Sequence, residues 1–85
     1  MTADSADLSP STRFAASERW GEPDEQEGSV NDPRTREEHG IRYNEKWIYL
    51  LPGGDRRLVY WLRYDFCGSV RIGRDASVRA EPWTP

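Results

Sequence analysis

Residues 41–64, IRYNEKWIYLLPGGDRRLVYWLRY, decide the fold of this chain. They contain two runs rich in β-branched and aromatic residues, 41–51 and 57–64, on either side of the turn-forming stretch 52–55. Two further short strands are expected at 69–72 and 76–81, after turns at 65–68 and 73–75. Because the connections are short, consecutive strands should pair antiparallel. The sequence therefore predicts a mainly β module, a three- to four-stranded antiparallel meander that could curl into a small barrel.

The two central strands of this meander are apolar on both faces. Alternation places Trp47, Tyr49 and Leu51 with Leu58, Tyr60, Leu62 and Tyr64 on one face, and Ile48, Leu50, Val59 and Trp61 on the other. An antiparallel sheet with one face in water should alternate apolar and polar residues, so the second face needs a cover. Left bare, it would form a patch on the order of 400–500 Å², a size typical of interaction sites.

Three covers are open at this point. The sheet could be covered from within the chain, by curling into a barrel or by the segment Ser9–Trp20 folding back with Phe14 and Trp20. It could stack on a second copy in a homodimer. It could instead dock on a different protein. The predicted partner-binding residues are therefore Ile48, Leu50, Val59 and Trp61.

The chain divides near Gly40 into two halves of opposite character. Residues 1–40 hold ten acidic and four basic residues and only three of the 14 Leu, Ile, Val and Phe residues, whereas residues 41–85 hold five acidic and eight basic ones. A segment with so little apolar surface cannot offset its ordering entropy alone. We expect 1–40 to be an acidic, largely flexible N-terminal arm and 41–85 to be the small antiparallel β module. The arm carries signals for two short helices, Ser9–Gly21 and Asp32–Gly40.

Length and composition bound the remaining possibilities. With 85 residues, only 35% of them hydrophobic, the chain is too short and polar for two domains or a membrane span. Its one cysteine, Cys67, excludes an intrachain disulfide framework and a cysteine-based zinc site, and it suits a reducing compartment. No secretory signal is visible, so a cytoplasmic protein is expected. Eleven arginines against one lysine are typical of a GC-rich bacterial or phage genome.

No stretch of the sequence predicts catalytic residues, a metal site or a cofactor. Glu37-Glu38-His39 lacks a second histidine or cysteine nearby, and Cys67 has no neighbouring base. The favoured function is non-catalytic protein–protein interaction by a small accessory, regulatory or assembly protein.

The alternative function is nucleic-acid binding. In this interpretation Arg56, Arg57, Arg63, Arg71 and Arg74 act together with Tyr60, Trp61 and Tyr64, and the acidic arm competes with nucleic acid for the same surface.

Overall fold

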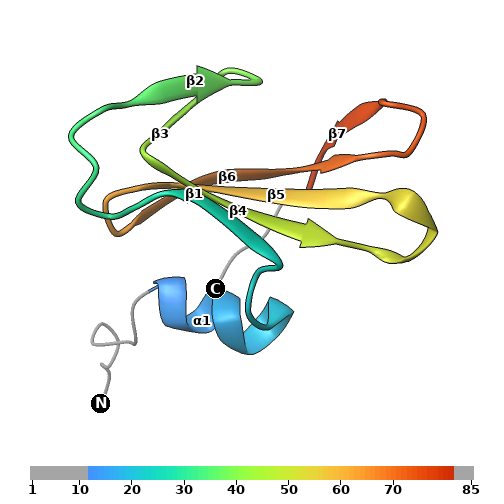
Figure 1. Cartoon of the computed structure of the whole chain (residues 1–85), viewed down its shortest axis with the longest axis horizontal. Coiled ribbons are helices and arrows are strands. Elements are labelled where there is room, and N and C mark those ends of the chain that lie inside the picture. Colours follow the sequence, from blue (N-terminus) through green and yellow to red (C-terminus); the bar gives the residue numbers. More distant parts are fainter. Residues whose placement is uncertain (1–11, 82–85) are drawn as a thin grey trace, which may run out of the picture.

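A computed structural model describes residues 12–81 of the chain, which form a mainly β structure with one helix (Figure 1). The elements in chain order are α1 (Thr12–Trp20), β1 (Glu25–Gly28), β2 (Arg36–Glu38), β3 (Ile41–Tyr43), β4 (Glu45–Leu50), the 3-10 turn η1 (Pro52–Gly54), β5 (Arg56–Leu62), β6 (Asp65–Ile72) and β7 (Val78–Ala80). Five strands make one antiparallel sheet in the order β1-β4-β5-β6-β7, and β2 and β3 form a separate hairpin. The predicted mainly β class is confirmed. The described strands do not close into a barrel.

The predicted strands are present with shifted boundaries. The first is divided at Asn44 into β3 and β4, and the second is β5. The predicted turn at 65–68 is wrong, because the chain reverses at Arg63-Tyr64 and β6 begins at Asp65. Trp61 pairs with Phe66 and Tyr60 with Gly68, so Cys67 is the extra residue of a β-bulge inside β6.

Part of the acidic half takes its place in this sheet. Its residues 12–40 supply α1, β1 and β2, and β1 pairs antiparallel with β4 through all four of its residues. The second predicted helix, Asp32–Gly40, is wrong, because this stretch contains β2 and the turn of the β2–β3 hairpin. The expected boundary near Gly40 falls in that turn. Residues 1–11 of the expected arm lie outside the described residues.

The pairing of β4 with β5 corrects the predicted faces. The connection between them contains five residues, 51–55, so Leu50 pairs with Arg56 and Trp47 with Val59. A one-residue change of register moves a strand's side chains to the opposite face. One face therefore carries Trp47, Tyr49, Val59 and Trp61, and the other carries Ile48, Leu58, Tyr60, Val70 and Ile72.

Helix α1 covers the first of these faces. Ala16 is fully buried there, and Ala15 and Trp20 pack beside it on the cluster around Trp61. The ring of Trp20 meets Tyr49 edge to face at 6.1 Å. This face is therefore covered from within the chain. Phe14, which was predicted to contribute to the cover together with Trp20, is instead 55% exposed.

A buried ion pair fixes α1 to the sheet. The carboxylate of Glu45 is fully buried and accepts hydrogen bonds from the Arg13 guanidinium at 2.6 and 3.1 Å. It also accepts from Gln26 Nε2 at 2.7 Å and Trp47 Nε1 at 2.9 Å. Arg13 in turn lies over the rings of Trp47 and Trp61. A buried charge needs this many partners to be tolerated.

Asn44 holds the kink between β3 and β4. Its buried side chain donates to the backbone carbonyls of Val30 and Asp32 at 3.3 and 3.1 Å and accepts from the backbone N–H of Arg63 at 2.9 Å. These bonds join the loop before β2 to the turn between β5 and β6. The kink directs the β2–β3 hairpin over the second face of the sheet.

This hairpin covers only one end of the second face. The Tyr43 ring packs on Tyr60 at 4.7 Å, and Ile41 packs over Gly68, where a Cβ would lie 3.0 Å from the Ile41 Cδ1 atom. In Figure 1, the β2–β3 hairpin and the β7 end of the sheet rise on the same side, opposite α1. A groove lies between them, lined by His39 of the β2–β3 turn and by Ala76 and Val78 at the β7 end, and it is the candidate site.

Candidate protein-binding groove

A groove of about 420 Å³, with an apolar floor and charged side chains around it, lies on the sheet face opposite α1. Ile48, Leu58 and Ile72 form its floor, each less than one-tenth exposed. The register explains this set. Ile48 on β4 pairs with Leu58 on β5, and in the next row of the same face Arg56 on β5 pairs with Ile72 on β6.

Two exposed apolar side chains border this floor. Leu50 at the end of β4 is 56% exposed, and Val78 at the start of β7 is 47% exposed. Both line the groove, together with His39 from the β2–β3 turn and Ala76 from the β6–β7 turn. Large apolar side chains left in water beside an apolar floor are typical of a surface that is covered on binding.

A network of hydrogen bonds closes the groove at the β2–β3 end. The Glu38 carboxylate accepts from Tyr60 Oη at 2.8 Å and from Lys46 Nζ at 3.1 and 3.2 Å. Lys46 also lies 3.4 Å from Glu27. Burial alone would raise the pKa of Glu38, but the hydrogen bonds from Tyr60 and Lys46 lower it. Burial and the hydrogen bond to Glu38 raise the pKa of Tyr60 far above its usual value.

The groove also carries two charged side chains without such partners. Glu25 on β1 and Arg56 on β5 both line it, and neither has an ion pair within residues 12–81. Both are exposed. They are therefore available to a bound molecule, whereas Lys46 already contacts Glu38 and Glu27.

The structure places the four predicted partner-binding residues on two faces. Ile48 and Leu50 belong to the groove, whereas Val59 and Trp61 are completely buried in the cluster beneath α1. Sequence reasoning missed Leu58, Ile72, Val78 and Glu25, and it assigned Arg56 to nucleic-acid binding. A face count extended to 69–72 and 76–81 could have found Ile72 and Val78. The residues of β1, EQEG, give no strand signal that could have found Glu25.

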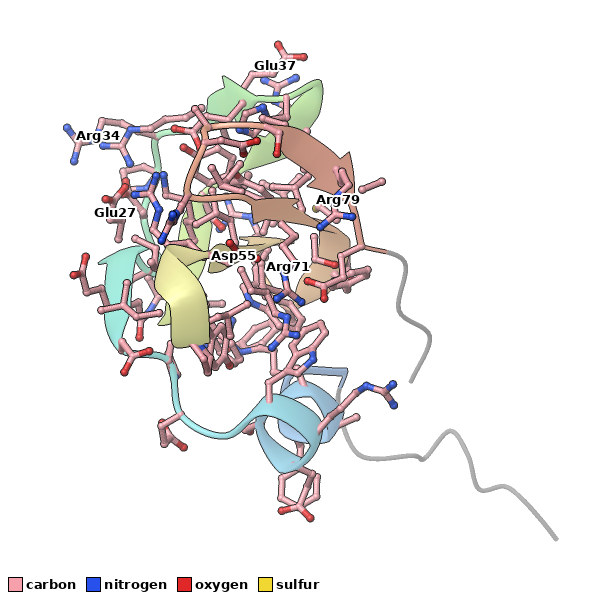
Figure 2. All side chains as sticks on the ribbon, turned by 90° about the vertical axis from the view of Figure 1, so that its right-hand side faces the viewer. Glu27, Arg34, Glu37, Asp55, Arg71 and Arg79 are labelled. Atoms are coloured by element: carbon pink, nitrogen blue, oxygen red, sulfur yellow. The ribbon has the colours of Figure 1, made fainter. Side chains whose placement is uncertain are left out.

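The five arginines predicted for nucleic-acid binding do not form one surface. Arg57 is held by Glu81 at 2.9 and 3.1 Å and lies over the Trp20 ring, and Arg71 contacts Asp55 at 3.1 Å. Arg56 lines the groove on the opposite face. The remaining two, Arg63 and Arg74, lie in the β5–β6 and β6–β7 turns. Figure 2 shows Arg71 beside Asp55, away from Arg34.

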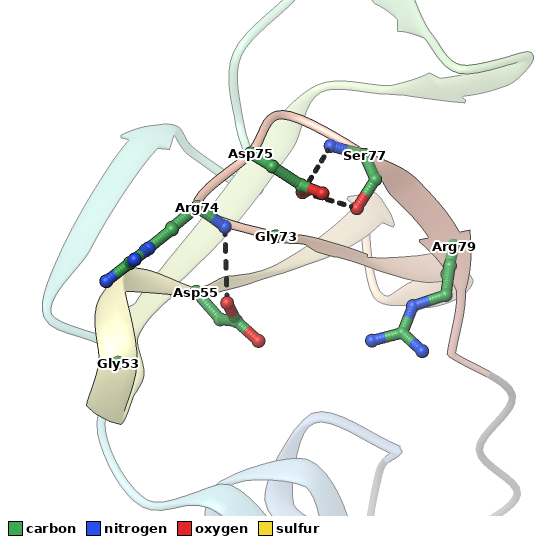
Figure 3. A pocket seen from close by; sticks show the side chains of 7 residues that line it. All are labelled: Gly53, Asp55, Gly73, Arg74, Asp75, Ser77 and Arg79. Carbon is green, nitrogen blue, oxygen red and sulfur yellow. Dashed lines mark hydrogen bonds between the residues drawn. The ribbon is translucent and has the colours of Figure 1, made fainter.

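A second, polar hollow of about 560 Å³ lies between η1 and the β6–β7 turn (Figure 3). Asp55 accepts there from the backbone N–H of Arg74 at 3.2 Å. Asp75 accepts from the hydroxyl and the backbone N–H of Ser77 at 2.7 and 3.1 Å, and these two bonds lower its pKa. The Asp55 carboxylate thus binds the neighbouring β6–β7 turn, whereas the Asp75 carboxylate binds the turn that carries it. Residues 12–81 contain no group of three or more His, Cys, Asp or Glu side chains arranged to hold a metal ion.

The Cys67 thiol is exposed at the bulge, and partial burial raises its pKa, which keeps it protonated at neutral pH.

Within residues 12–81 no helix has the length and apolar character needed to cross a bilayer. Compared with known proteins, the chain matches no family model, and no curated protein and no solved structure is significantly similar to it.

Proposed function

We propose that this chain is a non-catalytic protein-binding module whose groove receives a segment of a partner protein. The observation that carries this proposal is the apolar floor of Ile48, Leu58 and Ile72 bordered by the exposed Leu50 and Val78. Covering Leu50 and Val78, which carry most of the exposed apolar surface of the groove, removes that surface from water at about 25 cal/mol per Å². Such a module fits the accessory or assembly role expected from its size.

The shape of the groove favours an inserted segment over a second copy of the chain. The β2–β3 hairpin and the β7 end rise beside the floor (Figure 1). Two concave faces would meet at these raised parts before their floors came into contact. A narrow segment of another protein can reach the floor directly.

Nucleic-acid binding has less support. Tyr60 and Trp61 are fully buried, so their rings are not accessible to bases. Arg57 and Arg71 are bound to carboxylates that a phosphate would have to displace. A titration with a fluorescent oligonucleotide at low salt should therefore give no tight binding; steep salt-dependent binding would favour the alternative instead.

Selection of short random-sequence peptides on the immobilised chain tests the protein-binding proposal. Enriched peptides should bind the wild type and lose about tenfold or more in affinity for Leu50→Gln, which replaces an exposed groove side chain by a polar one of similar size. The matched control is Phe14→Gln, on α1 at the other side of the sheet, which should leave the affinity unchanged. If no peptide is enriched, or if Leu50→Gln binds as well as the wild type, the proposal is wrong.

A further inference from the structure

The two unpaired charges of the groove give its occupant a polarity. Glu25 lies on β1 opposite Ile48, and Arg56 lies on β5 opposite Leu50. Both residues line the groove and are exposed. The other two charged residues of the groove already have partners, because Lys46 lies 3.4 Å from Glu27 and 3.1 Å from Glu38. Electrostatic complementarity of such border charges sets which partner binds and in which orientation.

The register gives the separation of these two charges. β4 lies between β1 and β5, so two strand spacings separate Glu25 from Arg56 across the sheet. Along the strands they are offset by the two residues from Ile48 to Leu50. With spacings of about 4.8 Å between strands and 3.4 Å per residue, their Cα atoms are about 12 Å apart. Four residues of an extended chain cover about 13 Å.

An extended segment of this length has a definite pattern. Its residues i, i+2 and i+4 point to the same side. When residue i lies beside Glu25 and residue i+4 beside Arg56, residue i+2 lies over β4, where Ile48 and Leu50 provide an apolar surface. Residues i+1 and i+3 face solvent and are unrestricted.

We propose that the groove selects an extended partner segment with a basic residue, an apolar residue and an acidic residue at alternate positions. The basic residue binds Glu25, the apolar residue covers the floor beside Leu50, and the acidic residue binds Arg56. The pattern can run in either chain direction, because the side chains alone define it. This inference rests on the proposed function and specifies the chemistry of the partner.

Charge reversal on both molecules tests this pattern. The probes are fluorescein-labelled peptides enriched on the wild-type chain, which should contain the basic-x-apolar-x-acidic pattern. Glu25→Arg should raise their Kd about three- to tenfold, and so should Arg56→Glu, as expected for border charges. Changing the peptide's basic residue to Glu should weaken binding to the wild type and restore it on Glu25→Arg. Raising the salt concentration should reduce these differences, because exposed charges are screened.

Matched controls separate this result from a change of net charge or a loss of folding. Glu18→Arg and Arg19→Glu make the same charge changes on the exposed side of α1 and should leave Kd unchanged. If the peptides depend on Leu50 but show no charge pattern and no response to Glu25→Arg, the inference is wrong and the protein-binding function stands. If the peptides do not depend on Leu50, the proposed function itself is wrong. A dimer that Leu50→Gln dissociates would assign the groove to a second copy and also overturn the inference.

Discussion

Replacing Arg13 by methionine tests whether the ion pair to Glu45 holds α1 on the sheet. The substitution keeps an unbranched apolar chain over Trp47 but removes the guanidinium. Glu45, which is fully buried, would then keep only the hydrogen bonds from Gln26 and Trp47, and neither donor carries a charge. The carboxylate would remain buried without its counter-charge.

The expected loss is large for a chain of this size. Breaking a buried ion pair from one side costs about 3–5 kcal/mol, and since the Arg13 side chain is 23% exposed, we expect about 3 kcal/mol. In a domain of this length that loss lowers Tm by roughly 12–24 °C. Arg13→Lys keeps the charge but loses the two-pronged contact, and it should cost about 1–2 kcal/mol.

Urea denaturation followed by tryptophan fluorescence measures these free energies of unfolding. Arg19→Met, an exposed arginine on the same helix, is the control and should cost less than about 0.5 kcal/mol. Adding Glu45→Gln to Arg13→Met should recover part of the loss, because a neutral amide is cheaper to bury than an unpaired carboxylate. Equal effects of Arg13→Met and Arg19→Met would refute the role of this ion pair.

Three further changes test other parts of the fold. Gly28→Ala should lower the free energy of unfolding by more than about 2 kcal/mol, because the φ of Gly28 is +73° and the new Cβ would clash with the Asn44 carbonyl oxygen. Gly40→Ala is the control, because Gly40 has a similar φ of +78° but open space around it, and it should lower the same free energy by only about 1 kcal/mol. Asn44→Ala should cost about 2–4 kcal/mol, since it leaves three backbone groups without their partner, and hydrogen exchange should become faster in both loops that it joins. The lowered pKa of Glu38 means that its contribution to stability is complete above its ordinary value of 4.5 and is lost as the pH falls through the folded-state value. As the pH is lowered from neutral to acid, urea titrations should show a smaller loss of unfolding free energy for Glu38→Gln than for the wild type. An identical loss would contradict the stabilising role of the Glu38 carboxylate.

The sequence predicts the strands of this fold better than their pairing. The runs 41–51 and 57–64 and the turn 52–55 are visible because their residue types are strong signals. The pairing depends on whether four or five residues connect the strands. Here the connection has five residues, 51–55, and the backbone N–H of Leu51 closes it by donating to the carbonyl of Asp55. That one residue decides which face carries Val59 and Trp61.

The acidic half shows why the candidate site could be predicted only in part. Glu25-Gln26-Glu27-Gly28 has no β-forming residue, yet it forms β1 because the edge of β4 offers hydrogen bonds to its backbone. Likewise, the cap signal at Asp32-Pro33 resembles a helix start, but Asn44 binds the backbone of this segment from a distant position. Such tertiary contacts determine local structure without leaving a pattern in the segment itself. Ile48 and Leu50 could be predicted as site residues, but their charged neighbour Glu25 could not.

Methyl-detected NMR of the chain with an enriched peptide shows which apolar face of the sheet binds the partner, because the two faces carry different methyl groups. We expect the signals of the groove residues to shift on titration, whereas those of Ala16 and Val59 beneath α1 stay in place; the groove residues are Ile48, Leu50, Leu58, Ile72 and Val78. Shifts confined to Ala16, Val59 and their neighbours would contradict this expectation, because the partner would then bind where α1 lies.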